Sequence, residues 1–110
     1  MAELTKFQTI QLYRGATSEV SFDFTNFIFE PDTYCLLTIK NDYDDKAIFT
    51  YKFDEAKEYN VVFRDDFTIT LLDDDYIYDI MYIINDERYP QCKPSSVVVS
   101  QVVGSYESEN

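Results

Sequence analysis

Short runs in which apolar and polar residues alternate, separated by polar breaks, constrain the fold of this chain more than any other feature. The segment EVSFDF (19–24) alternates strictly, and the longer YIYDIMYIIN (76–85) places Tyr76, Tyr78 and Tyr82 in one phase. A period of two residues is that of a strand with one buried face and one solvated face. Ten Tyr and nine Phe against two Gly and no Trp favour strands as well. The sequence therefore predicts an all-β protein.

The polar breaks divide the chain into strand-length pieces. We expect strands over 7–13, 19–24, 33–40, 47–53, two short pieces within 60–72, then 76–85 and 95–103. The piece 33–40 is apolar in both phases, which is typical of a central strand. Only 54–59 has helical character, and it is too short to stand as a helix, so we expect a connecting loop or a single turn.

Connections of mostly hairpin length favour an antiparallel immunoglobulin-like β-sandwich of seven or eight strands, with a lipocalin-like barrel as the structural alternative. Nothing in the 110 residues suggests a linker, so we expect one β-sandwich domain over 1–110. Residues 104–110 have little apolar content and are expected to form a flexible C-terminal tail.

The charge balance excludes several partner classes. Nine Lys and Arg against 21 Asp and Glu give a net charge of -12, which repels nucleic acid and anionic membrane surfaces. No run approaches the roughly 18 apolar residues that span a bilayer. The first residues also lack the basic start and apolar middle of a secretory signal peptide, so we expect a cytoplasmic protein.

No motif identifies a reaction. The chain has no His, and its acids have no spacing that marks a catalytic pair, so we expect no enzymatic activity and no cofactor. The clusters 42–45 and 73–75 carry enough oxygens to ligate calcium, but neither matches an EF-hand loop. Because Asp and Asn are also the usual residues of turns, we interpret both clusters as turns and expect no metal site.

The two cysteines are ambiguous. Cys35 and Cys92 are 57 residues apart, a separation that suits a bridge across an immunoglobulin-type sandwich, but the tryptophan that packs on such a bridge is absent. We favour two reduced, structural cysteines.

Contact residues are sought among side chains that the core does not require. Several tyrosines lie at strand ends or in loops, two valines share one face of the last strand, and Asp79 interrupts an apolar strand. We expect Asp79 to lie on a solvated patch or beside a cation such as Arg64 or Lys52. The candidate contact residues are Tyr13, Tyr43, Tyr59, Asp79, Tyr89, Val98 and Val102.

Two motifs resemble a known family. A turn at 14–17 follows the first strand, and a late segment opens the longest strand with Leu72, Tyr76, Tyr78, Asp79 and Ile80. This order resembles the small β-sandwich proteins of phage tail and prophage clusters, similar to the N-terminal domain of phage baseplate upper proteins. Ala16 stands where an acid is usual, and Asp74 where a glycine is usual. A similarity to fibronectin-type domains, with Leu72 and Tyr78 as a tyrosine corner, is the alternative explanation by fold alone.

The resemblance implies a function without chemistry. We expect a structural or assembly module of a phage or prophage particle, made in the bacterial cytoplasm and then built into the virion. Its partners would be other copies of itself or a neighbouring phage structural protein. The alternatives are a carbohydrate- or ligand-binding module, suggested by the aromatic content, and an acidic regulator of a basic protein.

Overall fold

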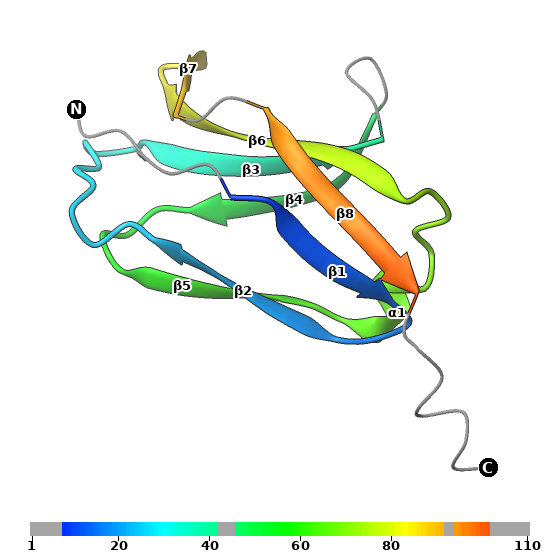
Figure 1. Ribbon diagram of the computed structural model, residues 1–110. Helices are drawn as coiled ribbons and strands as arrows, with labels where there is room; N and C mark the ends of the chain where they lie inside the picture. The colour runs from blue at the N-terminus through cyan, green and yellow to red at the C-terminus, as the bar shows by residue number, and fades with distance from the viewer. Residues whose placement is uncertain (1–7, 42–45, 92–93, 102–110) are drawn as a thin grey trace.

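The computed structural model describes residues 8–41, 46–91 and 94–101, which form eight strands and one short helix (Figure 1). The elements in chain order are β1 (Ile10–Arg14), β2 (Ser18–Asp23), β3 (Tyr34–Lys40), β4 (Ala47–Phe53), β5 (Glu58–Phe63), α1 (Asp65–Thr68), β6 (Asp75–Ile84), β7 (Glu87–Pro90) and β8 (Ser95–Gln101). No helix in these ranges is long and apolar enough to span a bilayer.

The strands form two sheets. The large sheet has the order β1-β8-β6-β3-β4, and β7 pairs with β6 along the edge that β8 also uses. The small sheet is β2-β5 and lies beneath the large one in Figure 1. The prediction of an all-β sandwich is confirmed, whereas the immunoglobulin-like detail stays a prediction.

The core lies between the two sheets because each strand turns one phase of its residues inward. In β6, Tyr76, Tyr78, Ile80 and Tyr82 are all buried, as their shared phase predicted. Phe22 of the small sheet meets Phe53 of the large sheet with ring centroids 5.4 Å apart. Phenylalanine and tyrosine rings in tilted and edge-to-face contacts thus supply much of the core.

One strand pair differs from the antiparallel prediction. β1 and β8 are parallel, with Ile10 opposite Val97 and Arg14 opposite Gln101. Parallel neighbours need a long connection between them, and here the rest of the domain separates the two strands. Because no hairpin joins β1 to β8, the two strands need not be antiparallel.

The piece 67–72, after Arg64-Asp65-Asp66, was expected to be a second short strand, and this was wrong. Asp65–Thr68 is the single turn α1. Residues 54–57 form a connecting loop, as expected, and β5 (Glu58–Phe63) takes up only the last two residues of the expected loop 54–59. Two acids in the first turn of α1 suit the positive end of a helix, and the Asp65 N–H donates to Thr17 Oγ1 at 3.0 Å. In β5, Tyr59 is fixed instead by its register opposite Phe22.

The strand β7 was not predicted. The turn expected at 85–87 is the two-residue loop Asn85-Asp86, with φ of 50° and 67°. These are the positive angles of the tight turns that join hairpins, which Asn and Asp tolerate. The chain therefore folds back and pairs β7 with the end of β6, from Ile84 opposite Glu87 to Met81 opposite Pro90.

Candidate functional site

The large sheet has a second face, which points away from the small sheet, and no other described strand or helix lies over it in Figure 1. Alternation places the residues of β3 and β6 that do not enter the core on this face. The register pairs Tyr34 with Ile83, Leu36 with Met81, and Thr38 with Asp79 across the two strands. We call this surface the outer face.

The centre of the outer face is apolar. Its residues are Tyr34, Leu36, Ile77, Met81 and Ile83, of which Ile83 is buried and the others half-buried by their neighbours within the sheet. A solvated face of an antiparallel sheet normally carries polar residues, and strands apolar on both faces are normally covered on both. The outer face thus has the composition of a sheet surface that is buried against another element or another protein.

Cations surround this apolar centre. Lys40 lies opposite Ile77 on the neighbouring strand, and Arg88 lies opposite Ile83 on β7. Lys52 of β4 lies opposite Leu36, and its Nζ lies 4.7 Å from the centre of the Tyr34 ring. These three residues form the basic rim of the outer face, on a chain whose net charge is -12.

Asp79 lies in the middle of the outer face and is half-buried. Burial raises the pKa of its carboxyl, an effect opposed by the positive charges of Lys40 and Arg88. We expected Asp79 on a solvated patch or beside a cation such as Arg64 or Lys52; it is half-buried, and the cations that act on its carboxyl are Lys40 and Arg88. A small hollow beside the carboxyl is lined by Thr38, Lys40, Ile77 and Pro94 among others.

A second surface lies where α1 joins β6. Ile69 is 56% exposed there, and Leu72 is 83% exposed, the largest fraction among the large hydrophobic residues that the structure describes. Four exposed acids, Asp65, Asp66, Asp73 and Asp74, flank these two in the sequence. We call this segment, 65–74, the acidic end.

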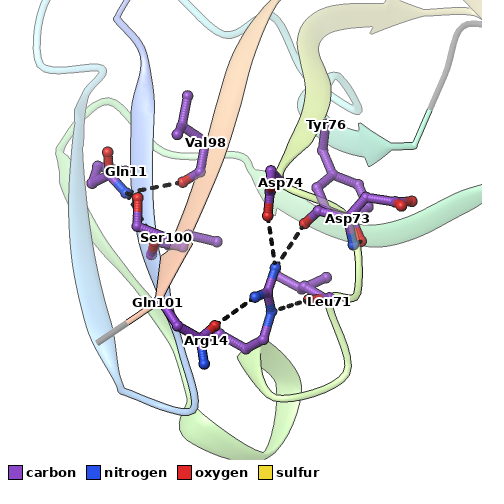
Figure 2. Close-up of polar contacts among 10 residues, drawn as sticks. Gln11, Arg14, Leu71, Asp73, Asp74, Tyr76, Val98, Ser100 and Gln101 are labelled. Carbon is purple, nitrogen blue, oxygen red and sulfur yellow. Dashed lines mark hydrogen bonds and ion pairs between the residues drawn. The ribbon is translucent and has the colours of Figure 1, made fainter. Parts of the chain in front are cut away.

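Arg14 fixes the backbone of the acidic end (Figure 2). Its Nε donates to the Leu71 carbonyl at 2.5 Å, and its Nη2 donates to the Asp73 carbonyl at 3.1 Å and to Asp74 Oδ1 at 3.3 Å. Its Nη1 donates to Gln101 Oε1 at 2.6 Å. One half-buried guanidinium therefore joins the last residues of β1 and β8 to the loop before β6.

Thr68 makes a second attachment at the same place. Its buried Oγ1 accepts from the Gly15 N–H at 3.0 Å and donates to the Ala16 carbonyl at 2.8 Å. The 14–17 turn and the segment that opens β6 are the two motifs that carry the family resemblance. They are far apart in the sequence and in contact in the fold.

In the 73–75 triplet, Asp73 and Asp74 form a solvent-exposed bend, and Asp75 begins β6. All three aspartates are exposed, and the Asp73 N–H donates to the hydroxyl of Tyr76 at 3.1 Å. A tyrosine at the start of a strand that bonds back to the preceding loop resembles a tyrosine corner. The residues expected for such a corner, Leu72 and Tyr78, do not form it, because Leu72 is exposed and the Tyr78 hydroxyl donates to the Gln8 carbonyl.

The candidate contact residues do not form one cluster. Tyr13 is 44% exposed on β1, Tyr89 is 39% exposed on β7, and Val98 of β8 lies opposite Asp75 at the end of the outer face. The Tyr59 hydroxyl accepts from the Asp54 and Glu55 N–H groups, so it closes a loop. Tyr43, Val102 and the predicted tail 104–110 lie outside the described residues.

Alternation alone places Met81 and Ile83 on the face of Asp79. Sequence reasoning missed the other residues that make the two surfaces distinctive, which are Leu36 at the apolar centre, Lys40 and Arg88 in the rim, and Ile69 and Leu72 at the acidic end. A signal was present for Leu36, since 33–40 is apolar in both phases. Leu72 gave none, because exposure of a loop leucine depends on the fold around it.

The described residues that could act as a nucleophile or as metal ligands, namely Cys35 and the carboxylates, do not form a reactive site. Cys35 has a free thiol in the core, where burial raises its pKa to about 12. Cys92 lies outside the described residues. Over 8–41, 46–91 and 94–101, no three or more Asp, Glu or Cys side chains converge on a point that would hold a metal ion.

Comparison of the chain with models of protein families and with curated proteins finds no match to either.

Proposed function

We propose that this protein is a non-enzymatic assembly module that acts through protein contacts made by its outer face. The observation that carries the proposal is the apolar centre on the uncovered side of the two central strands, surrounded by Lys40, Lys52 and Arg88. An apolar centre inside a polar rim is the usual anatomy of a protein interface. We place the module in a phage or prophage particle of tail or baseplate type, synthesised in the bacterial cytoplasm and then incorporated into the virion.

The phage assignment is supported by the order of the two motifs and by their contact through Arg14. A turn after the first strand and a tyrosine-rich opening of the longest strand are what the family resemblance rests on, and this chain uses them to lock one end of the sandwich. An immunoglobulin-like arrangement of the strands belongs to the same proposal.

A non-enzymatic role is supported by what the polar side chains do. The Tyr82 hydroxyl lies 2.9 Å from Thr33 Oγ1 and accepts from the Glu30 N–H, which holds the loop before β3. Tyr59 and Arg14 likewise satisfy backbone groups of loops. These groups stabilise the fold and are not left facing a substrate.

Carbohydrate binding receives less support. Tyr13 and Tyr89, the more exposed of the candidate tyrosines that the structure describes, lie on β1 and β7, which are not neighbouring strands: β1 pairs with β8 and β7 with β6 (Figure 1). Sugar recognition by stacking needs rings that converge on one ligand.

The test compares Met81→Arg, which places a charge in the apolar centre, with Val62→Arg on the exposed side of β5. Both proteins are checked for folding by circular dichroism. We expect wild type and Val62→Arg to be recovered in purified particles, and Met81→Arg to be lost from them. A folded Met81→Arg protein incorporated as well as wild type, or a wild type never found in particles, would refute the proposal.

A further inference from the structure

The outer face and the acidic end are complementary in both apolar character and charge. The outer face offers an apolar centre with a basic rim, and the acidic end offers Ile69 and Leu72 among four aspartates. We infer that the partner of the outer face is the acidic end of a second copy of this chain, so that copies join head to tail. This inference rests on the proposed function, and it names the partner.

The apolar part of the argument concerns Leu72. Its side chain is 83% exposed, yet the flanking backbone is held at Leu71 and Asp73 by Arg14. A protruding side chain on a fixed backbone loses little conformational freedom when it docks, which favours its use as an anchor. Burying Leu72 against Met81 and Leu36 would cover apolar surface on both partners.

The electrostatic part concerns which surfaces can meet. Two copies with a net charge of -12 repel one another at most relative orientations. Contact between the rim of Lys40, Lys52 and Arg88 and the aspartates of the acidic end brings opposite charges together. Pairing of two outer faces would instead bring two basic rims together.

The two surfaces share no residue, although they adjoin at one corner, where Asn41, next to Lys40, donates from Nδ2 to Asp73 Oδ2 at 2.8 Å. The aspartates of the acidic end precede β6, whereas Arg88 lies opposite Ile83 near the other end of that strand. An interface between two different surfaces is heterologous, and each copy keeps one unused surface on either side. Such contacts generate a ring where the rotation between copies closes, and an open string where it does not.

A mixing experiment tests the inference directly. Met81→Arg removes the outer face and keeps the acidic end, and Leu72→Asp does the reverse. We expect the wild type to self-associate in sedimentation velocity at low ionic strength, and each variant to be monomeric, with association weakened at least about thirtyfold as for loss of an interface anchor. An equimolar mixture of the two variants is expected to form a heterodimer that grows no further.

Two further variants at exposed positions test whether the loss of self-association is specific to the two surfaces. Arg88→Glu removes one rim charge at an exposed position, and we expect it to weaken self-association about tenfold. Ile28→Asp changes another exposed loop hydrophobe, outside both surfaces, and is expected to behave as wild type.

The outcomes separate the inference from the proposed function. A mixture that stays monomeric, a monomeric wild type, or a Leu72→Asp protein that self-associates like wild type would overturn the head-to-tail contact. If Met81→Arg is nevertheless excluded from particles, the outer face binds a different protein and the proposed function stands. If Met81→Arg is incorporated normally, the proposed function fails too.

Discussion

Asp79 shows at the scale of one residue how the outer face differs from a solvated sheet. It lies opposite Thr38 between two apolar neighbours of its own phase, Ile77 and Met81. Burial disfavours its charged form more than Lys40 and Arg88 favour it, so its pKa is raised. A carboxylate in this position reduces the stability of the isolated domain, and it also limits which surfaces can dock here.

We expect Asp79→Asn to stabilise the isolated domain at neutral pH. Because the folded-state pKa is raised, the unfolded state ionises first as pH increases, and wild-type stability falls through that range. Below the unfolded pKa of about 4, both states are protonated and the difference disappears. Chemical denaturation of both proteins should thus show a gain for Asn at pH 7 that shrinks towards pH 3. A less stable Asn variant at pH 7 would mean that attraction to Lys40 and Arg88 outweighs burial.

The sequence predicts which face of the strand Asp79 lies on, but it does not predict the cations that lie near its carboxyl. Alternation alone assigns it to the face of Ile77 and Met81, because the period of a strand is local. Its cations depend on the register that sets Lys40 opposite Ile77, and on the β6–β7 hairpin that brings Arg88 back. Both are long-range pairings, which a single-sequence pattern leaves open.

At the scale of elements, α1 connects the segment before β6 to the turn between β1 and β2, and we call this contact the latch. It is a single turn, too short to be stable alone, and it is held by Thr17 at its first residue and by Thr68 against the 15–16 turn. The alternating pattern of 67–72 suggested a strand, but these tertiary contacts and the acids of its first turn prevail over local preference. Helix formation here is a consequence of docking, which explains why the sequence did not predict it.

We expect Thr68→Val to destabilise the domain by about 1–3 kcal/mol, the usual effect of leaving a buried donor without its partner. The change preserves shape and removes the Oγ1 that bridges Gly15 and Ala16. Urea denaturation is the measurement. Thr70→Val, which alters an exposed hydroxyl of the same segment, is the control and should change stability by less. Equal stability of Thr68→Val and wild type would show that the latch contributes little.

At the scale of the whole molecule, the dominant feature is an uneven distribution of charge. Three of nine basic residues gather at the rim of one face, while aspartates gather at the acidic end. The net charge, and the expectation that nucleic acid and anionic membranes are not partners, followed from composition alone. The asymmetry did not, because Lys40, Lys52 and Arg88 come from three different strands that only the folded sheet brings together.

We expect self-association to weaken as salt is added. The Debye length falls from about 10 Å at 0.1 M to about 3 Å at 1 M, which screens attraction between the basic rim and the acidic end. Sedimentation velocity across this range should show a rising dissociation constant. Arg88→Glu should flatten the salt dependence, since it removes one of the attractive charges. Association that strengthens with salt would indicate an interface dominated by apolar contact or relief of repulsion.

The parallel pairing of β1 with β8 determines how the domain bears mechanical load. Their ladder runs from Ile10 opposite Val97 to Arg14 opposite Gln101, so Ile10 and Gln101 lie at opposite ends of it. Tension applied ahead of Ile10 and beyond Gln101 would shear all these backbone hydrogen bonds together, whereas an antiparallel pair joined at one end would unzip bond by bond. The Gln11 side chain donates to the Val98 carbonyl and to Ser100 Oγ (Figure 2), and these hydrogen bonds also oppose sliding of β1 along β8. A subunit pulled from its two ends would therefore resist as a shear clamp.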